Sequence, residues 1–492
     1  MSREGYAMNM WTNPWPRLEL VPAEGIEAID ATALRILEEI GHRVTHEPTL
    51  ELLRGAGLKI DGDVVHFDRG FVREALARAP SSFELQARNP EMNCVVGGNH
   101  MVNSPTGGAP FLSDLDGGRR PGNVEDYIKL VKAAHMSPQI HCIDSGIVET
   151  MDLPVETRHL DMDYLVMRHS DKPLMTGGTS YETTKDAMEM AAILFGSTEA
   201  IEKTPGVIGV VNPVSPLVWD DRMLGSMHAL ANANQPVIVT PFLMAGTSAP
   251  VTMAGGMAHW CAENLAGIAI LQTIRPGCPT VFGGYLTATD MALGQPTLGS
   301  PEWSMSILAG AQMARHYDLP FRGGGGWSSA KTVDAQSGYE TVMGLWPALL
   351  SGTNFMLHAA GALESTMIIS AEKMIMDFEV LRMFEWMLDP GLPVNDDTLA
   401  FDASAEIGPG GMFLSATHTL THFRSALYRS ELASLEDVNL WNEQGSKDTQ
   451  VRANERYKQM IADYEDPGLD DAIDEELQAF MARRKSEITT SI

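Results

Sequence analysis

The segment Leu319–Lys373 contains the side chains whose types and spacing are best suited to chemistry. Four consecutive glycines, Gly323, Gly324, Gly325 and Gly326, follow a short apolar run, and they let the backbone turn sharply because no Cβ blocks a positive φ. Trp327 and Lys331 come next, and His358 ends the following apolar run before a second turn of small residues. Two successive strands that end in this way are typical of a site built on the loops after parallel strands. A pair of tight turns with no further role is the alternative.

The other predicted strand ends are rich in small residues, hydroxyls, amides and aromatic rings. They are Thr106-Gly107-Gly108, Asp144-Ser145, Thr176-Gly177-Gly178, Asn212-Pro213, Thr240-Pro241 and Gly283-Gly284-Tyr285. Paired carboxylates, metal-ligand clusters and nucleophile–base pairs are scarce among them. Hydrolysis by two carboxylates or by a metal-bound water is therefore disfavoured. The many glycines predict a wide opening that admits a large ligand.

Both signs of charge could be recognised at these strand ends. Trp327, Tyr285 and Phe242 offer π faces to a cation, although each could equally pack in a core. Arg322 and Lys331 could hold an anion. These residues alone predict an open, polar and aromatic site in an enzyme or binding protein, but they do not predict a reaction.

The histidines have structural interpretations as well as functional ones. His358 could hydrogen-bond a ligand carboxylate, or its ring could be hydrogen-bonded only within the fold at a strand end. His418 and His422 are four residues apart and could bind a metal if that segment is helical. No HExxH pattern or nearby carboxylate completes such a site in the sequence, so we expect no metal site.

From about Met101, short apolar strands alternate with amphipathic helices. The predicted strands are Met101–Ser104, Ile140–Ser145, Pro173–Thr176, Val207–Val211, Val237–Pro241, Thr280–Gly283, Phe321–Gly323 and Asn354–Leu357. The predicted helices are Val124–His135, Thr157–His169, Thr183–Phe195, Asp220–Asn234, Val251–Ile274, Pro301–Tyr317, Ala335–Leu350 and Ser370–Leu388. Eight such units close a parallel barrel whose site lies at the strands' C-terminal ends. A doubly wound sheet is the alternative, but no GxGxxG motif opens a helix after an early strand.

We therefore expect an α/β fold, a (β/α)8 TIM barrel over residues 101–390. Residues 1–100 predict a small N-terminal α+β cap, with a helix over Ala23–His42 and a hairpin turning at Asp61-Gly62. Residues 391–492 predict a C-terminal helical extension packed on the barrel. Its helices are expected at Leu420–Leu427, Ser446–Tyr464 and Leu469–Lys485.

Composition excludes several classes of partner. The net charge of −29, from 35 Lys and Arg against 64 Asp and Glu, argues against nucleic acid and anionic membrane surfaces. Four scattered cysteines without CxxC spacing predict reduced thiols of a cytoplasmic protein. The first twenty residues lack the apolar core of a signal peptide, and no uninterrupted apolar tract predicts a membrane span.

Long ordered motifs along most of the chain resemble the trimethylamine methyltransferase superfamily of the MttB type. They are FRGGGGWSSAKTVDAQSGYE, GTNFMLHAAGALESTMIISAEKMIMDFE, VTPFLMAGTSAPVTMAGGMA and the C-terminal run THFRSALYRSELASLEDVNLWNEQGSKDTQVRANERYKQMIADYEDPGLD. The resemblance implies a corrinoid-dependent (β/α)8 enzyme. Such enzymes move a methyl group from an amine to Co(I) of a corrinoid carried by a small partner protein. A homo-oligomer is also possible.

One departure from the family narrows the expected substrate. Trimethylamine-specific members carry pyrrolysine near the active site, whereas this chain contains only the twenty standard residues. Members without pyrrolysine resemble demethylases of quaternary amines such as glycine betaine. A quaternary ammonium leaves as a neutral tertiary amine, so positioning suffices and no general acid is needed. A sulfonium such as dimethylsulfoniopropionate meets the same requirement.

The resemblance also implies roles for residues in these motifs. Trp327, Tyr285 and Phe355 are candidates for a cage around the ammonium group, although Phe355 could point into the barrel core. His358, with Lys331 or Arg322, could fix the substrate carboxylate.

Further residues of the motifs are expected to support this site. Glu364, Asp334 and Gln336 could orient the binding groups, although Asp334 could simply cap the next helix. Two other classes stay open: a betaine-binding barrel without catalysis, and a methyltransferase with another acceptor such as tetrahydrofolate.

The glycine runs are expected to serve the cofactor. With no side chains in the way, they would admit the flat face of the corrinoid. They are Gly107, Gly108, Gly323, Gly324, Gly325 and Gly326.

Overall fold

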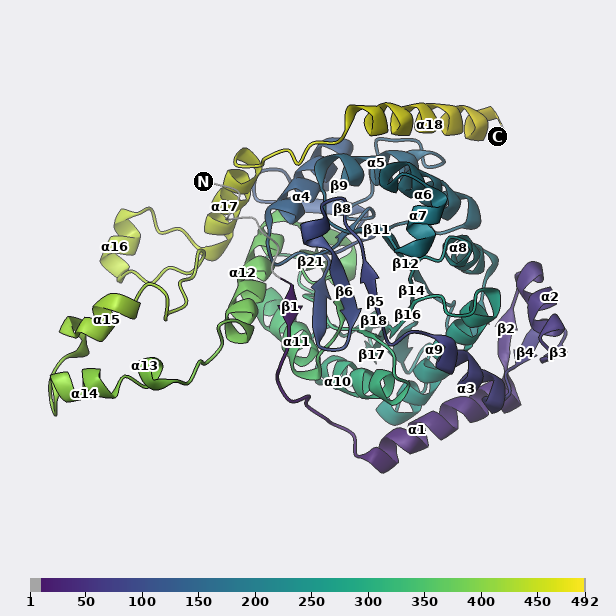
Figure 1. Cartoon of the computed structure of the whole chain (residues 1–492), viewed down its shortest axis with the longest axis horizontal. Coiled ribbons are helices and arrows are strands. Elements are labelled where there is room, and N and C mark those ends of the chain that lie inside the picture. Colours follow the sequence, from purple (N-terminus) through teal and green to yellow (C-terminus); the bar gives the residue numbers. More distant parts are fainter. Residues whose placement is uncertain (1–9, 491–492) are drawn as a thin grey trace.

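Eight parallel strands form one curled sheet at the centre of the computed structural model, which describes residues 10–490 (Figure 1). In spatial order they are β10 (Ile143–Asp144), β11 (Leu174–Thr176), β12 (Val207–Val211), β14 (Val237–Val239), β16 (Thr280–Gly283), β19 (Phe321–Arg322), β20 (Phe355–Met356) and β7 (His100–Asn103). Each is parallel to the next. The amides of His141 and Cys142, just before β10, also donate to the carbonyl of Asn103 at 2.8 and 3.1 Å. The fold is thus a mixed α/β fold around a large curled parallel sheet.

Helices connect these strands and surround the sheet (Figure 1). They are α4 (Val124–Met136), α5 (Arg158–His169), α6 (Tyr181–Phe195), α7 (Thr198–Lys203), α8 (Asp221–Asn232), α9 (Met253–Ile274), α10 (Pro301–His316), α11 (Ala335–Ser351) and α12 (Ala371–Leu388). Apart from the short α7, each matches a predicted helix within a few residues, as each strand matches a predicted strand. These elements were predictable because their apolar patterns are local and repeat.

Alternate side chains of the strands fill the interior of the curled sheet. Val102, Met175, Ile208, Val281 and Phe355 belong to one buried cluster there. The antiparallel strands β5 (Ser82–Leu85) and β6 (Cys94–Gly97) contribute to the same cluster. This interior is a packed core rather than a channel, so ligands are restricted to the ends of the strands.

Loops after the strands form small sheets that the sequence did not predict. One contains β15 (Phe242–Ala245), β17 (Tyr285–Asp290) and β18 (Gln295–Pro296), and the other contains β8 (Phe111–Asp114), β9 (Gly118–Pro121), β21 (Ala362–Leu363) and β22 (Ile368–Ser370). Between β21 and β22 lies the 3-10 turn η4 (Glu364–Thr366). Several of these strands pair with partners far along the chain, so no local pattern marks them.

The N-terminal part joins the curled sheet at one end and the helical layer at its side. Its elements are β1 (Trp11–Thr12), α1 (Ala23–Arg35), the π-helical turn η2 (Ile36–Ile40), β2 (His42–Val44), α2 (Glu47–Gly55), β3 (Lys59–Asp61), β4 (Val64–His66), α3 (Arg69–Arg78) and the 3-10 turn η3 (Pro90–Met92). The predicted hairpin at Asp61-Gly62 is confirmed by the β3–β4 pairing. A strand from the central region, β13 (Val218–Trp219), pairs with β2. The prediction that the first twenty residues contain no signal peptide falls partly on residues 1–9, which lie outside the described range.

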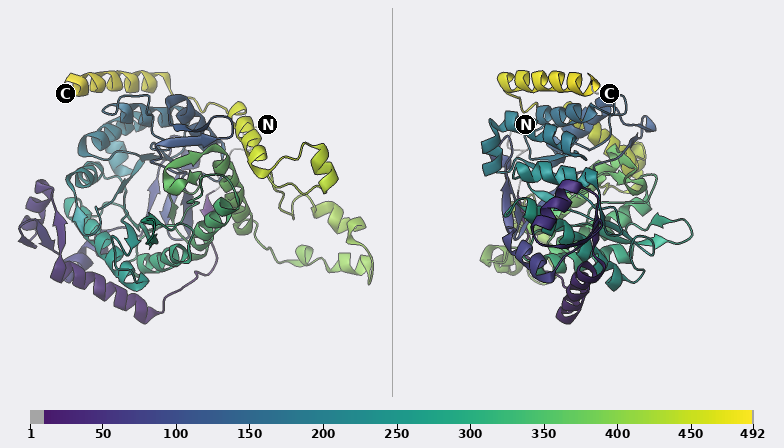
Figure 2. Two further views of the ribbon diagram at one scale, coloured as in Figure 1. Left: turned by 180° about the vertical axis from the view of Figure 1, so that it is seen from behind. Right: turned by 90° about the vertical axis from the view of Figure 1, so that its right-hand side faces the viewer.

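Residues 391–448, called the arm below, extend away from the rest of the molecule before the chain returns (Figures 1 and 2). The arm holds α13 (Asp396–Leu399), α14 (Phe401–Ile407), η5 (Phe413–Ser415), α15 (Thr417–His422) and α16 (Val438–Glu443). The predicted helix Leu420–Leu427 is wrong, because α15 begins earlier and ends at His422. After the arm, α17 (Thr449–Ala462) packs on α12 and α4, and α18 (Asp471–Thr490) packs on α6 and α5.

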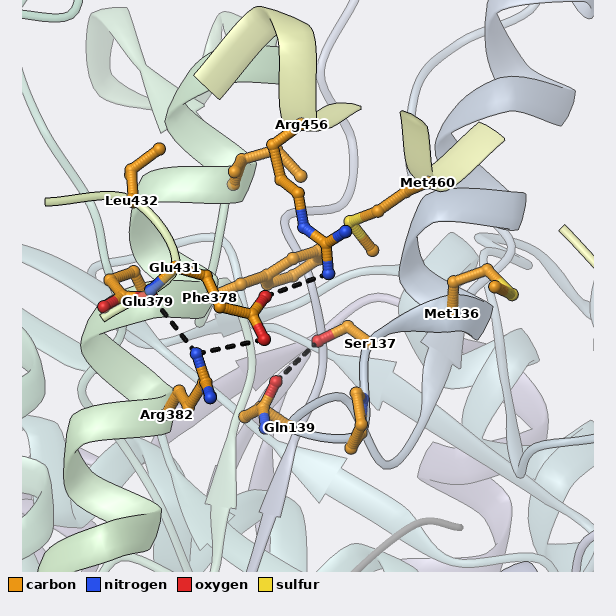
Figure 3. Close-up of a pocket in the computed structure, with 12 residues that line it drawn as sticks. Met136, Ser137, Gln139, Phe378, Glu379, Arg382, Glu431, Leu432, Arg456 and Met460 are labelled. Carbon is orange, nitrogen blue, oxygen red and sulfur yellow. Dashed lines mark hydrogen bonds and ion pairs between the residues drawn. The ribbon is translucent and has the colours of Figure 1, made fainter. Parts of the chain in front are cut away.

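Ion pairs fix the returning end of the arm. Glu431 pairs with Arg382 of α12 at 3.2 Å and with Arg456 of α17 at 2.9 Å (Figure 3). These residues line a hollow of about 270 Å³ between α4, α12 and the arm. The hollow shares no lining residue with the cavity at the strand ends described below.

No helix of residues 10–490 is long and apolar enough to cross a membrane.

Candidate functional site

A cavity of about 340 Å³ lies at the C-terminal ends of the parallel strands. The polar, charged and aromatic residues that line it are Asp144, Glu149, Thr176, Thr179, Asn212, Thr240, Phe242, Tyr285, Arg322, Trp327 and His358. Most of them belong to, or closely follow, a strand of the curled sheet or of the small sheet after it. This is the position in which parallel α/β folds place their ligand sites. The sequence placed the site on two consecutive loops, whereas residues at or after all eight parallel strands line this cavity.

Aromatic rings form one wall of the cavity. The ring of Trp327 lies 6.0 Å from that of Phe242 with nearly parallel planes, and 4.6 Å from Tyr285. Tyr285 itself is stacked on Trp303 at 4.8 Å, and the Arg322 guanidinium lies 4.0 Å from its ring centre. Stacking on Trp303 and on Arg322 engages the faces of Tyr285. The rings of Trp327 and Phe242 are therefore better placed than Tyr285 to face a cation in the cavity.

Arg322 is a buried cation that forms no ion pair with the described residues. Its side chain is 2% exposed, and one terminal nitrogen donates to Oγ1 of Thr240 at 2.8 Å. Its Nε has no hydrogen-bond partner in residues 10–490. A buried guanidinium that is not neutralised is costly, and this one lines the cavity. An anionic group entering the cavity would satisfy it.

His358 is held in a strained backbone conformation at the edge of the cavity. Its φ is +63°, in the left-handed region that non-glycine residues rarely adopt. The amide of Gly107 donates to its Nδ1 at 3.3 Å. Burial, followed by the nearby charge of Arg322, lowers the pKa of His358 well below its ordinary value. The ring is therefore neutral near pH 7, and with Nδ1 accepting, the proton is on Nε2, which can donate to a ligand.

Asp144 brings a carboxyl group into close contact with the Gly107 turn. Burial raises the pKa of Asp144 to about 7, and the amide of Gly146 donates to this carboxyl at 2.7 Å. A Cβ placed on Gly107 would overlap the Asp144 carboxylate. Gly107 is therefore required by close approach of the two strands' ends.

The structure does not bring every predicted site residue to the cavity. Lys331 is exposed, and its Nζ donates to the carbonyl of Ser329 at 2.7 Å. Phe355 is fully buried in the core inside the sheet. Because neither residue lines the cavity, Lys331 is not placed to hold a carboxylate there, and Phe355 is not placed in an aromatic cage.

Three other predicted residues hold the surrounding loops. Asp334 caps α11 by accepting from the amide of Ser337 at 3.1 Å, which is the structural alternative considered for it. Gln336 donates to Glu340 at 2.9 Å. Glu364 forms a partly exposed ion pair with Arg119 at 3.3 Å.

The predicted glycines divide into two groups. Gly107 and Gly108 line the cavity. The other four are buried and do not line it, and they are Gly323, Gly324, Gly325 and Gly326. The expectation that these four admit a corrinoid therefore has no support in this arrangement.

Close packing explains the run of four glycines instead. A Cβ at Gly324, whose φ is +74°, would meet the Cβ of Ala348 on α11 at 2.5 Å. A Cβ at Gly325 would meet the carbonyl oxygens of Leu357 and His358 at 2.9 and 2.8 Å. The run thus lets the end of β19 pack against α11 and against the end of β20.

Several cavity residues received no role from the sequence. Asp144, Thr176, Asn212 and Thr240 were noted only as strand ends, and Phe242 only as one possible π face. Their position directly after predicted strands was the available signal. Nothing local indicated that their side chains point into the cavity.

The arm holds a second group of potential ligands, one of which the sequence analysis did not find. The sequence showed no carboxylate near His418 and His422, yet the Oδ2 atom of Asp397 lies 3.5 Å from Nε2 of His422. The two imidazole rings are 4.4 Å apart. One donor atom from each of the three residues lies within 4.8 Å of the others. The carboxylate was missed because it lies on α13, far from α15 in the sequence.

Comparison with known proteins shows one family over nearly the whole chain. Residues 2–489 match the family described as Trimethylamine methyltransferase (MTTB). A protein of Desulfitobacterium hafniense (strain Y51) named "Glycine betaine methyltransferase" is 40% identical over 96% of this chain and 98% of its own length. A protein of Eubacterium limosum named "Proline betaine:corrinoid methyltransferase" is 27% identical, covering 91% of this chain and 94% of its own length.

The fold is similar to that of a solved methyltransferase. The crystal structure of the Methanosarcina barkeri monomethylamine methyltransferase (MtmB) matches with a TM-score of 0.53 at 10% identity. The match covers 95% of this chain and 92% of that chain. At this identity the likeness concerns the fold alone.

Proposed function

The chain belongs to the trimethylamine methyltransferase (MTTB) family, and from this we propose that it moves a methyl group from a quaternary amine to Co(I) of a corrinoid carried by a partner protein. Glycine betaine is the proposed substrate, since the relative that bears its name is 40% identical over almost the full length of both chains. Relatives named for proline betaine and L-carnitine are 27% and 26% identical. Glycine betaine, proline betaine and L-carnitine each carry a quaternary ammonium and a carboxylate.

The observation that carries this proposal is the pairing of a buried, unneutralised guanidinium with an aromatic wall in one cavity. Trp327 and Phe242 suit a quaternary ammonium, and Arg322 suits a carboxylate. The neutral His358 adds an Nε2–H donor for the same carboxylate. The Nε1–H of Trp327 also has no partner in residues 10–490. A betaine satisfies the cation-binding and the anion-binding part of the cavity at once.

The residues that line the cavity perform binding and orientation rather than acid–base chemistry. When bound, a Co(I) corrinoid supplies the nucleophile that takes the methyl group as the carbon–nitrogen bond breaks and the electron pair stays on nitrogen. Because the amine leaves neutral, no side chain has to donate a proton. Anchoring the carboxylate at Arg322 would hold the ammonium in one place, and the aromatic wall would keep water from it.

We place the flat face of the corrinoid at a glycine rim of the cavity. Gly108 and Gly177 line the cavity, are exposed and carry no side chain, whereas Gly107, Gly146 and Gly178 line it but are buried. The names of the two corrinoid methyltransferases among the relatives support a corrinoid as the methyl acceptor. In this proposal the small partner protein presents its corrinoid at this glycine rim.

The proposal also covers the barrel architecture, the cellular location and the oligomeric state of the protein. We take the curled sheet as a (β/α)8 barrel over residues 101–390, supported by the hydrogen bonds from His141 and Cys142 to Asn103. Residues 1–100 then form the N-terminal cap, and residues 391–492 form the helical extension. A cytoplasmic location agrees with the four free, buried cysteines, and a homo-oligomer is compatible with the extended arm.

A spectroscopic assay tests the proposed reaction. Purified protein is mixed with free cob(I)alamin and, in turn, with glycine betaine, proline betaine, carnitine, dimethylsulfoniopropionate and trimethylamine. Decay of the Co(I) band with growth of methyl-Co(III) is expected for glycine betaine and not for trimethylamine. Decay of the Co(I) band with dimethylsulfoniopropionate alone would identify a sulfonium, and not glycine betaine, as the substrate. Calorimetric binding of a betaine without any Co(I) decay would indicate a binding protein instead.

A further inference from the structure

The arm contains a three-residue cluster outside the methyl-transfer site, formed by Asp397, His418 and His422. His418 and His422 are four residues apart on α15, so their side chains share one face of that helix. Asp397 lies on α13, and its carboxylate contacts His422. We propose that this cluster binds a divalent transition-metal ion, with Zn²⁺ as its fitting occupant, and that the ion joins α13 to α15.

The chemistry of the donors selects the class of ion. Two imidazole nitrogens and one carboxylate oxygen suit Zn²⁺ and related transition metals, whereas Ca²⁺ and Mg²⁺ prefer oxygen ligands. Ligands at about 2.0–2.1 Å around a tetrahedral ion lie about 3.3 Å from each other. The separation of 3.5 Å between His422 Nε2 and Asp397 Oδ2 already matches this spacing. The three donor atoms lie within 4.8 Å of one another, and in this proposal the His418 ring, whose Nε2 now lies 3.2 Å from the carbonyl oxygen of Asp397, turns toward the ion.

The surroundings favour a cation and leave room for it. Asp396, Asp402 and Glu406 line a hollow next to the cluster together with Asp397 and His418. No lysine or arginine lines this hollow in the described arm. The cluster residues are partly exposed, so an ion and a water ligand can enter.

The arm also lacks the apolar core that would otherwise hold it together. Of its residues 391–448, only Ala403, Ala416 and Leu432 are buried. Its α-helices are short, from α13 with 4 residues to α14 with 7, and such short helices are unstable without tertiary support. A segment with so little core gains order from a metal, because the binding free energy adds to folding free energy. The position of the cluster between α13 and α15 is suited to that role.

Metal binding to the full-length, tag-free protein tests the proposal. After chelator treatment, the protein is dialysed against Zn²⁺ and the bound metal is measured by mass spectrometry. Because the chain has 14 histidines, the result is read as a difference between variants. Asp397→Asn and His422→Gln should each lose one equivalent relative to the wild type. Asp402→Asn, a carboxylate of the same hollow outside the cluster, should keep it.

A second measurement probes the arm itself and keeps the test decisive if a variant folds poorly. Trypsin can cut the wild-type arm after the exposed Arg424 and Arg429. Zn²⁺ at about 100 times its Kd should suppress local opening, and hence cleavage there, about 100-fold. Mg²⁺ should give no protection. Retention of the equivalent by Asp397→Asn, or cleavage of the wild-type arm at the same rate with and without Zn²⁺, would overturn the proposal.

Discussion

Replacing Arg322 by methionine should weaken the binding of glycine betaine without lowering the stability of the free protein. In the proposed complex the substrate carboxylate neutralises this buried guanidinium, and truncating one partner of such a pair costs about 2–5 kcal/mol. A loss of about 3 kcal/mol corresponds to a rise of about 150-fold in the Kd for glycine betaine. In the free protein, by contrast, the guanidinium donates to the Thr240 hydroxyl and lies over the Tyr285 ring, but it forms no ion pair within residues 10–490. Methionine has similar bulk and no charge, so the free energy of unfolding should stay equal or rise by about 1–4 kcal/mol.

Isothermal titration with two ligands makes this prediction specific. Choline carries the same trimethylammonium group as glycine betaine but a hydroxyl in place of the carboxylate. Its affinity should change little in Arg322→Met, because its cation meets only the aromatic wall.

A matched arginine provides the control. Arg120 lies 2.6 Å from Asp114 and 2.9 Å from Asp126. Arg120→Met should therefore lower stability and leave betaine affinity unchanged. Arg322 does not bind the carboxylate if Arg322→Met binds glycine betaine within about threefold of the wild type, well short of the expected loss, or if choline loses as much affinity as glycine betaine.

Three further changes probe the same region. The pKa of Asp144 is raised to about 7, so between about pH 4 and pH 7 the folded state holds a proton that the unfolded state releases. Stability therefore falls as the pH rises through this range. Asp144→Asn should raise the Tm at about pH 8 and leave it unchanged at about pH 4, as thermal melts at both values will show. Gly107→Ala places a Cβ on the Asp144 carboxylate and should lower the Tm and cut methyl transfer by about tenfold or more, whereas Gly338→Ala, with open space around it, should alter neither. Lys373→Met leaves the buried Asp377, now 2.6 Å from Nζ, without its partner and should cost about 3–5 kcal/mol in urea unfolding; an unchanged midpoint would contradict the importance of this pair.

The sequence predicted the regular part of the fold and a minority of the residues that line the cavity. Apolar strands and amphipathic helices are local patterns, so the alternation between Met101 and Leu388 was readable without a structure. The small sheets after the strands were not, because β15 and β22 pair with partners far along the chain.

Side-chain direction explains the remaining differences. Arg322 and Lys331 were equal candidates for an anion, and only the structure separates a strand residue facing the cavity from an exposed loop residue. Phe355 and Phe242 differ in the same way, since one lies inside the sheet and the other follows a strand. The contact of Asp397 with His422 is long-range and has no local signal at all.

A product analysis of a single turnover tests the proposed methyl transfer most directly. The protein is incubated with glycine betaine and cob(I)alamin, and dimethylglycine and methylcobalamin are both quantified by mass spectrometry. We expect the two products to form in equal amounts, and Arg322→Met to form them about tenfold or more slowly at betaine concentrations just sufficient to saturate the wild type. Binding of glycine betaine without formation of dimethylglycine would contradict methyl transfer as the function of this protein.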